Sequence, residues 1–358
     1  MKPKLKKSIK AIARLSNLEN RQSFLRLDKN ECLDKKISSY ISRSFMTNLK
    51  ETPISMYPEV GELKKKIADY TNLVPEQVIL GDGSDALIRQ VFTVFARPRS
   101  TIVLPIPTYA MYEIYTKLFD CKLRPIACED DFSHNPAKII KALSPEVSIV
   151  AIANPNSPTG REIKRSYLID ILKCCEQLGI LLLIDEAYYY FSKTTLLPEI
   201  NQSENLAVIR TFSKAFGLAG CRIGFLAANQ ALVANIQKAR PMYELNALSA
   251  VAASTALDNK VLAKEYASTV NMAKSFLREK LKPLGWKVFP SNTNFVNIRL
   301  PKHIDAGKFE DFAREKGILL KGRLGKEAFK NCIRITVGPI DIMKPLVSLV
   351  NIFSEENA

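Results

Sequence analysis

The sequence predicts an α/β protein, with a large domain built on a mostly parallel sheet flanked by helices and a smaller α+β domain after it. From residue 101 to about residue 245, short apolar runs alternate with stretches of helical periodicity, which is the pattern of βαβ units. Two of these runs, Val147–Ala153 and residues 180–184, are almost entirely apolar, as expected for strands buried on both faces of a sheet. With 358 residues, of which 47% are hydrophobic, the chain is long enough for more than one domain.

The elements are predicted in order from their periodicity. Helical spacing marks residues 61–72, 84–97, 263–284 and 308–316. Further strand-like runs cover residues 101–105, 286–289, 295–299 and 333–337. We therefore expect an N-terminal arm over residues 1–35 that joins the small domain, a large domain over residues 36–245 and a small C-terminal domain over residues 246–358.

Composition limits the possible functions. The net charge of +16 suggests an anionic ligand, but the basic residues are spread along the chain apart from one N-terminal cluster, Lys2, Lys4, Lys6, Lys7 and Lys10. Since no nucleic-acid-binding motif accompanies them, we expect a small anionic substrate and no nucleic acid. Seven cysteines without a C-x-x-C pair favour a reducing, cytoplasmic setting, and only two histidines disfavour a metal site. No apolar run approaches the roughly twenty residues of a membrane helix.

Residues 211–224, TFSKAFGLAGCRIG, carry the main functional prediction. They place Lys214 among small and hydroxyl-bearing residues, with Arg222 eight positions later. An activated lysine amine forms a Schiff base with a carbonyl, which indicates an aldehyde cofactor. Most lysines are simply exposed, however, so the prediction depends on the rest of the chain.

Three other motifs support it. Asp185 of DEAY follows the apolar run 180–184, and ligands bind at the carboxyl ends of parallel strands. The glycine-rich GDGSDALI, residues 81–88, opens a helical pattern and so offers backbone N–H groups to an anion. The proline-rich NPNSPTG, residues 154–160, follows the run Val147–Ala153.

In this order the motifs resemble the class I/II pyridoxal-phosphate-dependent aminotransferases of fold type I, and most closely the histidinol-phosphate aminotransferase-like branch. The similarity runs from about Arg26 to about Pro339. It also includes Tyr57-Pro58, PTYAMY at 107–112, Asn294-Phe295 and IRITVG at 333–338. The resemblance implies a transferase with pyridoxal 5'-phosphate as cofactor and a homodimer with shared active sites.

The resemblance also implies roles for individual residues. Lys214 would bond to the cofactor aldehyde and later carry a proton, and Asp185 would keep the pyridine nitrogen protonated. Tyr188 would donate a hydrogen bond to the ring oxygen. The cofactor phosphate and ring would further contact Ser84, Asp85, Tyr109, Thr211, Ser213 and Arg222, with Tyr109 stacked on the ring. The family has asparagine directly before Pro-Thr-Gly, where this chain has Ser157, so either Ser157 or the preceding Asn156 makes that contact.

For the substrate, the resemblance implies that Arg334 binds the distal anion and that Tyr57 reaches across the dimer interface. Lys321 stands where a second arginine is usual, which replaces a bidentate fork by a point charge. Asn30 is expected near the substrate as well. The arm lacks the Pro-Tyr-x-Pro-Gly signature of many histidinol-phosphate enzymes, and Glu244 stands where that branch often has asparagine.

We therefore expect an aminotransferase that acts on a small phosphorylated amino compound, histidinol phosphate or a related amino-alcohol phosphate, with glutamate and 2-oxoglutarate. The alternative is a decarboxylase of an O-phospho-amino acid of the threonine-phosphate or serine-phosphate type, because a small rotation of the substrate on the cofactor changes the bond that breaks. A non-catalytic regulator is disfavoured, since the arm before Arg26 is too short for a helix-turn-helix module.

Overall fold

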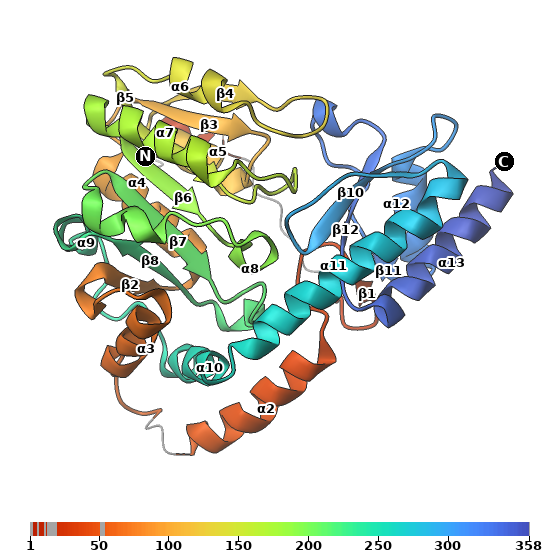
Figure 1. Cartoon of the computed structure of the whole chain (residues 1–358), viewed down its shortest axis with the longest axis horizontal. Coiled ribbons are helices and arrows are strands. Elements are labelled where there is room, and N and C mark those ends of the chain that lie inside the picture. Colours follow the sequence, from red (N-terminus) through yellow and green to blue (C-terminus); the bar gives the residue numbers. More distant parts are fainter. Residues whose placement is uncertain (1–2, 6, 11, 13–19, 51–53, 358) are drawn as a thin grey trace.

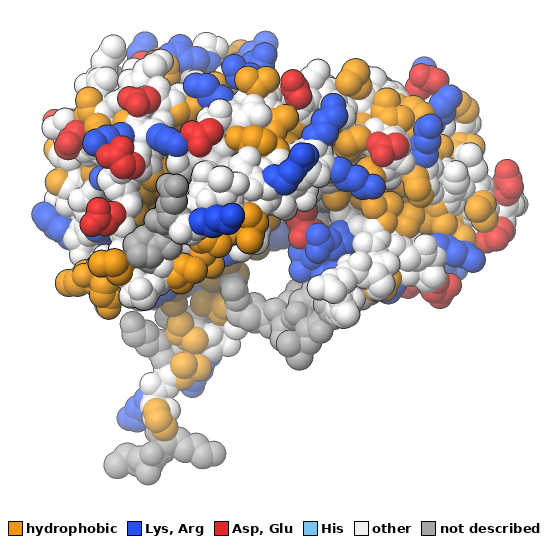
Figure 2. Space-filling view, turned by 90° about the horizontal axis from the view of Figure 1, so that it is seen from below, with side chains coloured by type: hydrophobic (Ala, Val, Ile, Leu, Met, Phe, Trp, Pro, Cys, Tyr) orange, Lys and Arg blue, Asp and Glu red, His pale blue; other side chains and the backbone are white. Residues whose placement is uncertain are grey.

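The computed structural model describes residues 3–5, 7–10, 12, 20–50 and 54–357, arranged in two lobes (Figure 1). Of the predicted basic cluster, Lys2 and Lys6 lie outside the described residues. Among the described residues, no helix combines the length and the apolar character that crossing a bilayer requires. On the face shown in Figure 2, lysines and arginines lie among acidic and hydrophobic side chains, in keeping with their spread along the sequence.

A seven-stranded sheet forms the larger lobe. Its order is β2 (Val78–Gly81), β8 (Gly224–Ala228), β7 (Leu206–Thr211), β6 (Leu181–Asp185), β5 (Val147–Ala153), β3 (Thr101–Ile106) and β4 (Lys122–Ala127). The five strands from β7 to β4 are mutually parallel, and β8 is antiparallel to both of its neighbours. The predicted α/β class with a mostly parallel sheet is confirmed.

Both faces of this sheet are buried, which explains its nearly uninterrupted apolar strands. In β6, Leu182 and Ile184 pack into one core, whereas Leu181 and Leu183 pack into a second core on the opposite face. The second core also contains side chains of α4 (Gly83–Phe95), α5 (Ala110–Leu118) and α9 (Gln230–Gln237). The first contains side chains of α3 (Gly61–Thr71), α7 (Arg165–Leu178), α10 (Ala247–Asp258) and α11 (Val261–Leu281).

The smaller lobe combines an antiparallel sheet with helices. The sheet has the order β12 (Cys332–Thr336), β10 (Phe295–Arg299) and β9 (Lys287–Val288). Helices α12 (Ala306–Glu315) and α13 (Ile340–Glu356) lie beside it, and α11 runs between the two lobes (Figure 1). The predicted strand at 286–289 is shorter in the structure, where β9 covers Lys287 and Val288.

The N-terminal segment joins this lobe through a short parallel pair. Strand β1 (Leu25–Arg26) pairs with β11 (Ile318–Leu319), and the chain then enters α2 (Lys35–Leu49). Helix α10 lies against α2 and α3. The shorter helices are α1 (Lys7–Lys10), α6 (Pro136–Lys141) and α8 (Tyr189–Ser192). The domain boundaries at 35/36 and 245/246 stay predictions.

Candidate active site

A cavity of about 500 Å³ lies where β5, β6 and β7 end. Parallel strands end at the same edge of a sheet, so Ala153, Asp185 and Thr211, the last residues of these strands, meet there. The start of α4 and the segment 28–31 close the cavity. Its predicted lining residues are Asn30, Ser84, Asp85, Tyr109, Ser157, Asp185, Tyr188, Thr211, Ser213, Lys214, Arg222, Lys321 and Arg334.

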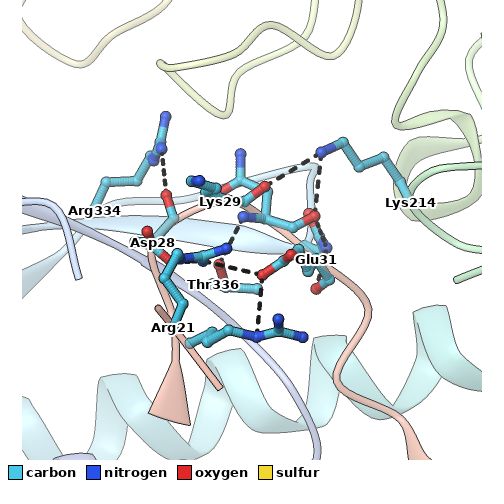
Figure 3. A network of polar contacts seen from close by, with 10 residues as sticks. Arg21, Asp28, Lys29, Glu31, Lys214, Arg334 and Thr336 are labelled. Carbon is cyan, nitrogen blue, oxygen red and sulfur yellow. Dashed lines mark hydrogen bonds and ion pairs between the residues drawn. The ribbon is translucent and has the colours of Figure 1, made fainter. Parts of the chain in front are cut away.

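Lys214 projects into this cavity from the loop after β7. Its Nζ donates hydrogen bonds to the carbonyl oxygen of Asn30 (3.2 Å) and, at 3.4 Å, to that of Lys29 (Figure 3). It lies 5.7 Å from the centre of the Tyr188 ring. The Tyr188 hydroxyl accepts a hydrogen bond from Asn30 Nδ2 (2.9 Å), which leaves its own hydrogen free to be donated.

Asp185 is the buried acid of the site, with 5% of its surface exposed. Its Oδ1 accepts a hydrogen bond from the Ala187 N–H (3.0 Å), and Oδ2 accepts one from the Tyr112 hydroxyl (3.1 Å). Burial raises the pKa of Asp185 to about 6, although both hydrogen bonds act to lower it. Tyr112 was not predicted as a site residue, and nothing in the local sequence marks it as a partner of Asp185.

The burial of Asp185 predicts a pH-dependent stability for the cofactor-free protein. Because its folded pKa is raised from an ordinary 3.8, its stabilising contribution is complete below that value and is lost as the pH rises through about 6. Between pH 4 and pH 8 the free energy of unfolding should therefore fall by about 2 kcal/mol relative to an Asp185→Asn variant. Urea unfolding of both proteins at several pH values tests this, and a pH-independent difference would contradict it.

The start of α4 and Arg222 form an anion cradle. Arg222 Nη1 lies 3.5 Å from Ser213 Oγ, and the Ser213 N–H donates to Thr211 Oγ1 (3.1 Å). Gly83 has φ +74°, and a Cβ there would lie 2.5 Å from Arg222 Nη2, so the guanidinium rests directly on the helix start. Free helical N–H groups beside a guanidinium suit a phosphate.

Ser157, and not Asn156, lines the cavity. Asn156 Nδ2 donates to the Pro107 carbonyl oxygen (2.8 Å) and to Thr159 Oγ1 (2.9 Å). Its Oδ1 accepts a hydrogen bond from the Thr108 hydroxyl (3.1 Å). The Asn156 amide is thus used inside the turn, which makes Ser157 the better candidate for a ring contact.

Arg334 and Lys321 form a cationic end of the cavity. Their backbones exchange two hydrogen bonds, Arg334 N–H to the Lys321 carbonyl (2.7 Å) and the reverse at 3.1 Å, so both side chains start from adjacent positions. Arg334 Nη2 donates to the Asp28 carbonyl oxygen (2.9 Å). Burial lowers the pKa of Arg334, opposed by Tyr188 and Asp28, but a guanidinium remains charged in proteins.

Tyr57 and Arg323 both lie outside the cavity. Tyr57 is 70% exposed and stacks on Tyr243, with ring centroids 3.7 Å apart, outside the cavity of its own chain. Arg323, two residues from Lys321, pairs with Glu310 and Asp311 on α12. A contact of Tyr57 with the substrate therefore requires a second copy of the chain.

The chain is similar in sequence to known proteins of one family. The family described as aminotransferase class I and II matches residues 22–348. The histidinol-phosphate aminotransferase of Clostridium novyi (strain NT) is 34% identical over 321 residues, 88% of this chain and 87% of that protein. The one of Thermoanaerobacter sp. (strain X514) is 31% identical over 326 residues, 90% and 91% of the two chains.

Solved structures give the same fold. The histidinol-phosphate aminotransferase from Sinorhizobium meliloti, in complex with pyridoxal-5'-phosphate, has a TM-score of 0.86 at 20% identity and covers 100% of this chain and 99% of its own. The L-threonine-O-3-phosphate decarboxylase from Porphyromonas gingivalis has a TM-score of 0.74 at 20% identity and covers 92% and 99%.

The chain belongs to the class I and II aminotransferase family. The predicted enzyme class, a pyridoxal-phosphate-dependent aminotransferase of fold type I, is confirmed. The residues present also fit the cofactor. The cavity offers an amine for its aldehyde in Lys214, an acid for its ring nitrogen in Asp185 and an anion cradle around Arg222 for its phosphate.

Proposed function

We propose that this aminotransferase acts on a small phosphorylated amino compound, histidinol phosphate or a related amino-alcohol phosphate, with 2-oxoglutarate and glutamate as the second pair. The observation that carries the proposal is the cationic end of the cavity, where Arg334 and Lys321 stand side by side. Relatives of at least 30% identity that cover most of the chain are histidinol-phosphate aminotransferases.

Bound pyridoxal phosphate supplies an aldehyde that accepts the amino group and a ring that stabilises negative charge at the substrate carbon. Lys214 would hold the cofactor aldehyde, and its free amine would move a proton as general base and then general acid. Asp185 would hold the ring nitrogen protonated by its negative charge, for which its two hydrogen bonds already favour the ionised form.

The remaining residues would orient the reactants. The cradle around Arg222 and Ser84 would fix the cofactor phosphate, Tyr188 would donate to the ring oxygen and Tyr109 would lie against the ring face. At the other end, Arg334 and Lys321 would bind the substrate phosphate, with Asn30 placed beside Tyr188 by their hydrogen bond. The cofactor phosphate would be fixed at one end of the cavity and the substrate phosphate at the other. Together these contacts would place the amine of the substrate next to the cofactor aldehyde.

A homodimer is part of the proposal. Tyr57 and Tyr243 form an exposed aromatic pair, and Met56 and Met242 beside them are exposed as well. Exposed apolar side chains gathered in this way are typical of protein interfaces. In a dimer, Tyr57 would contribute to the cavity of the partner copy.

The proposal is tested on purified, cofactor-loaded protein with matched pairs of amines. Histidinol phosphate and serinol phosphate are each compared with their unphosphorylated forms, and we expect kcat/KM to favour the phosphate ester by at least about 10²-fold. Glutamate should be formed from 2-oxoglutarate in the same reactions. Equal rates for both members of each pair would contradict the phosphate assignment.

Decarboxylation is distinguished in parallel. Phosphoserine and phosphothreonine are added separately while carbon dioxide is trapped and 2-oxo acid products are measured. Release of carbon dioxide without transfer of the amino group would contradict the proposed reaction. It would support the second candidate, a phospho-amino acid decarboxylase. Transfer of the amino group without carbon dioxide release would support the aminotransferase.

A further inference from the structure

We infer that Arg21 is a positioning residue: by holding the side chains of segment 28–31, it sets where the Lys214 and Arg334 side chains lie in the cavity. The inference rests on the proposed function for the roles of those two cations. Arg21 itself does not line the cavity, but it contacts Asp28 and Glu31, which do.

Arg21 binds two carboxylates of this segment. Its Nη2 forms an ion pair with Asp28 Oδ1 and lies 3.2 Å from Glu31 Oε2 (Figure 3). The Arg21 side chain is only 12% exposed, and Asp28 is 7% exposed. A carboxylate this far from water depends on its partner, because an unpaired buried charge is strongly unfavourable.

The same segment holds both cavity cations through its main chain. The Asp28 carbonyl oxygen accepts the hydrogen bond from Arg334 Nη2, and the Lys29 and Asn30 carbonyl oxygens accept those from Lys214 Nζ. Asn30 has φ 55°, a left-handed conformation, and its carbonyl oxygen faces Lys214 Nζ. Asp28 thus links the two sides: Arg21 holds its carboxylate, and its carbonyl holds Arg334.

Backbone contacts that do not involve Arg21 hold segment 28–31 on the small lobe. The Leu27 N–H donates to the Leu319 carbonyl oxygen (2.7 Å), and the Leu27 carbonyl oxygen accepts a hydrogen bond from the Thr336 N–H (2.8 Å). The Asn30 N–H donates to Thr336 Oγ1 (2.9 Å). These contacts do not involve Arg21. Loss of the Arg21 side chain should therefore change the orientation of the carbonyls at 28–30 without releasing the segment from the small lobe.

Arg21→Ala is compared with two other variants. Arg26→Ala is the matched control, since Arg26 lies just before segment 28–31 and its exposed guanidinium reaches Glu31 only at 3.6 Å. Arg21→Lys is the rescue, because lysine keeps the charge and loses the planar fork. Cofactor-free protein of each kind is titrated with pyridoxal phosphate, which can bond to Lys214, and with pyridoxamine phosphate, which has the same ring and phosphate but no aldehyde. KM and kcat are then measured on loaded enzyme.

We expect Arg21→Ala to weaken the binding of pyridoxal phosphate and to raise KM for the phosphorylated amine, each on the order of 10-fold, because small displacements of reacting groups are costly. Its affinity for pyridoxamine phosphate should be unchanged. Arg21→Lys should recover part of both effects, and Arg26→Ala should match the wild type.

Equal weakening of both cofactor forms in Arg21→Ala would show general damage and overturn the inference, as would no change in either. If the wild type does not use phosphorylated amines, the proposed function fails on its own. The attachment of pyridoxal phosphate still decides the role of Arg21 in that case.

Discussion

Replacement of Lys214 by alanine is expected to abolish the covalent link to pyridoxal phosphate and to lower turnover by at least about 10³-fold. Lys214 supplies both the amine that bonds to the cofactor and the group that moves the proton, so one substitution removes two functions. The cradle around Arg222 remains, and the variant should still bind the cofactor without a covalent bond.

Borohydride reduction followed by peptide mass spectrometry measures the link directly. Lys29→Ala is the informative control, because Lys29 is a second lysine that lines the cavity but belongs to segment 28–31. It should retain the reducible link on the peptide that contains Lys214. A reducible link that persists in Lys214→Ala would remove Lys214 from its proposed role.

For Arg334→Ala, we expect kcat/KM for the phosphorylated substrate to fall by about 30-fold to more than 10³-fold, which corresponds to about 2–5 kcal/mol for the loss of one partner of a desolvated charge pair. Most of the loss should appear in KM. The affinity for pyridoxal phosphate should change little, since the cofactor cradle is formed by α4 and Arg222 at the other end of the cavity.

Arg323→Ala serves as the control for Arg334, because it removes an arginine of the same lobe that is paired with Glu310 and Asp311. Its kinetic constants should stay at wild-type values. An unchanged KM in Arg334→Ala would exclude Arg334 from the anion site. If kcat/KM fell as much in Arg323→Ala as in Arg334→Ala, the effect would reflect the overall charge of the lobe and not a local contact of Arg334.

The parts of the fold that were predictable are those in which burial leaves a pattern in the sequence. Strand β5 was predicted at its exact bounds, and the prediction for β6 differed by one residue at each end. The apolar run ends at Ile184, but the backbone continues to pair through Asp185, which lies opposite Ile209. Hydropathy cannot show that a polar residue is the last in a strand.

The cavity residues were predictable because they lie in local motifs, whereas their long-range partners carry no such signal. The contact of Tyr112 with Asp185 joins residues that are 73 positions apart, and nothing near either residue indicates it. Asn156 and Ser157 are neighbours with similar chemistry, so only the path of the turn decides which one faces the cavity. Arg21 lies in a segment without periodicity, and its partners become apparent only in three dimensions.

The hydrogen bond between Asn30 and Thr336 also constrains when this part of the protein can fold during synthesis, since it spans 306 residues. At about 5–20 residues per second, the ribosome needs roughly 15–60 s to synthesise this interval. The wall that holds Lys214 thus emerges long before β12 and can be assembled only after β12 has been synthesised. In the meantime the charges of Asp28, Lys29 and Glu31 keep this stretch hydrated, which protects it from premature association.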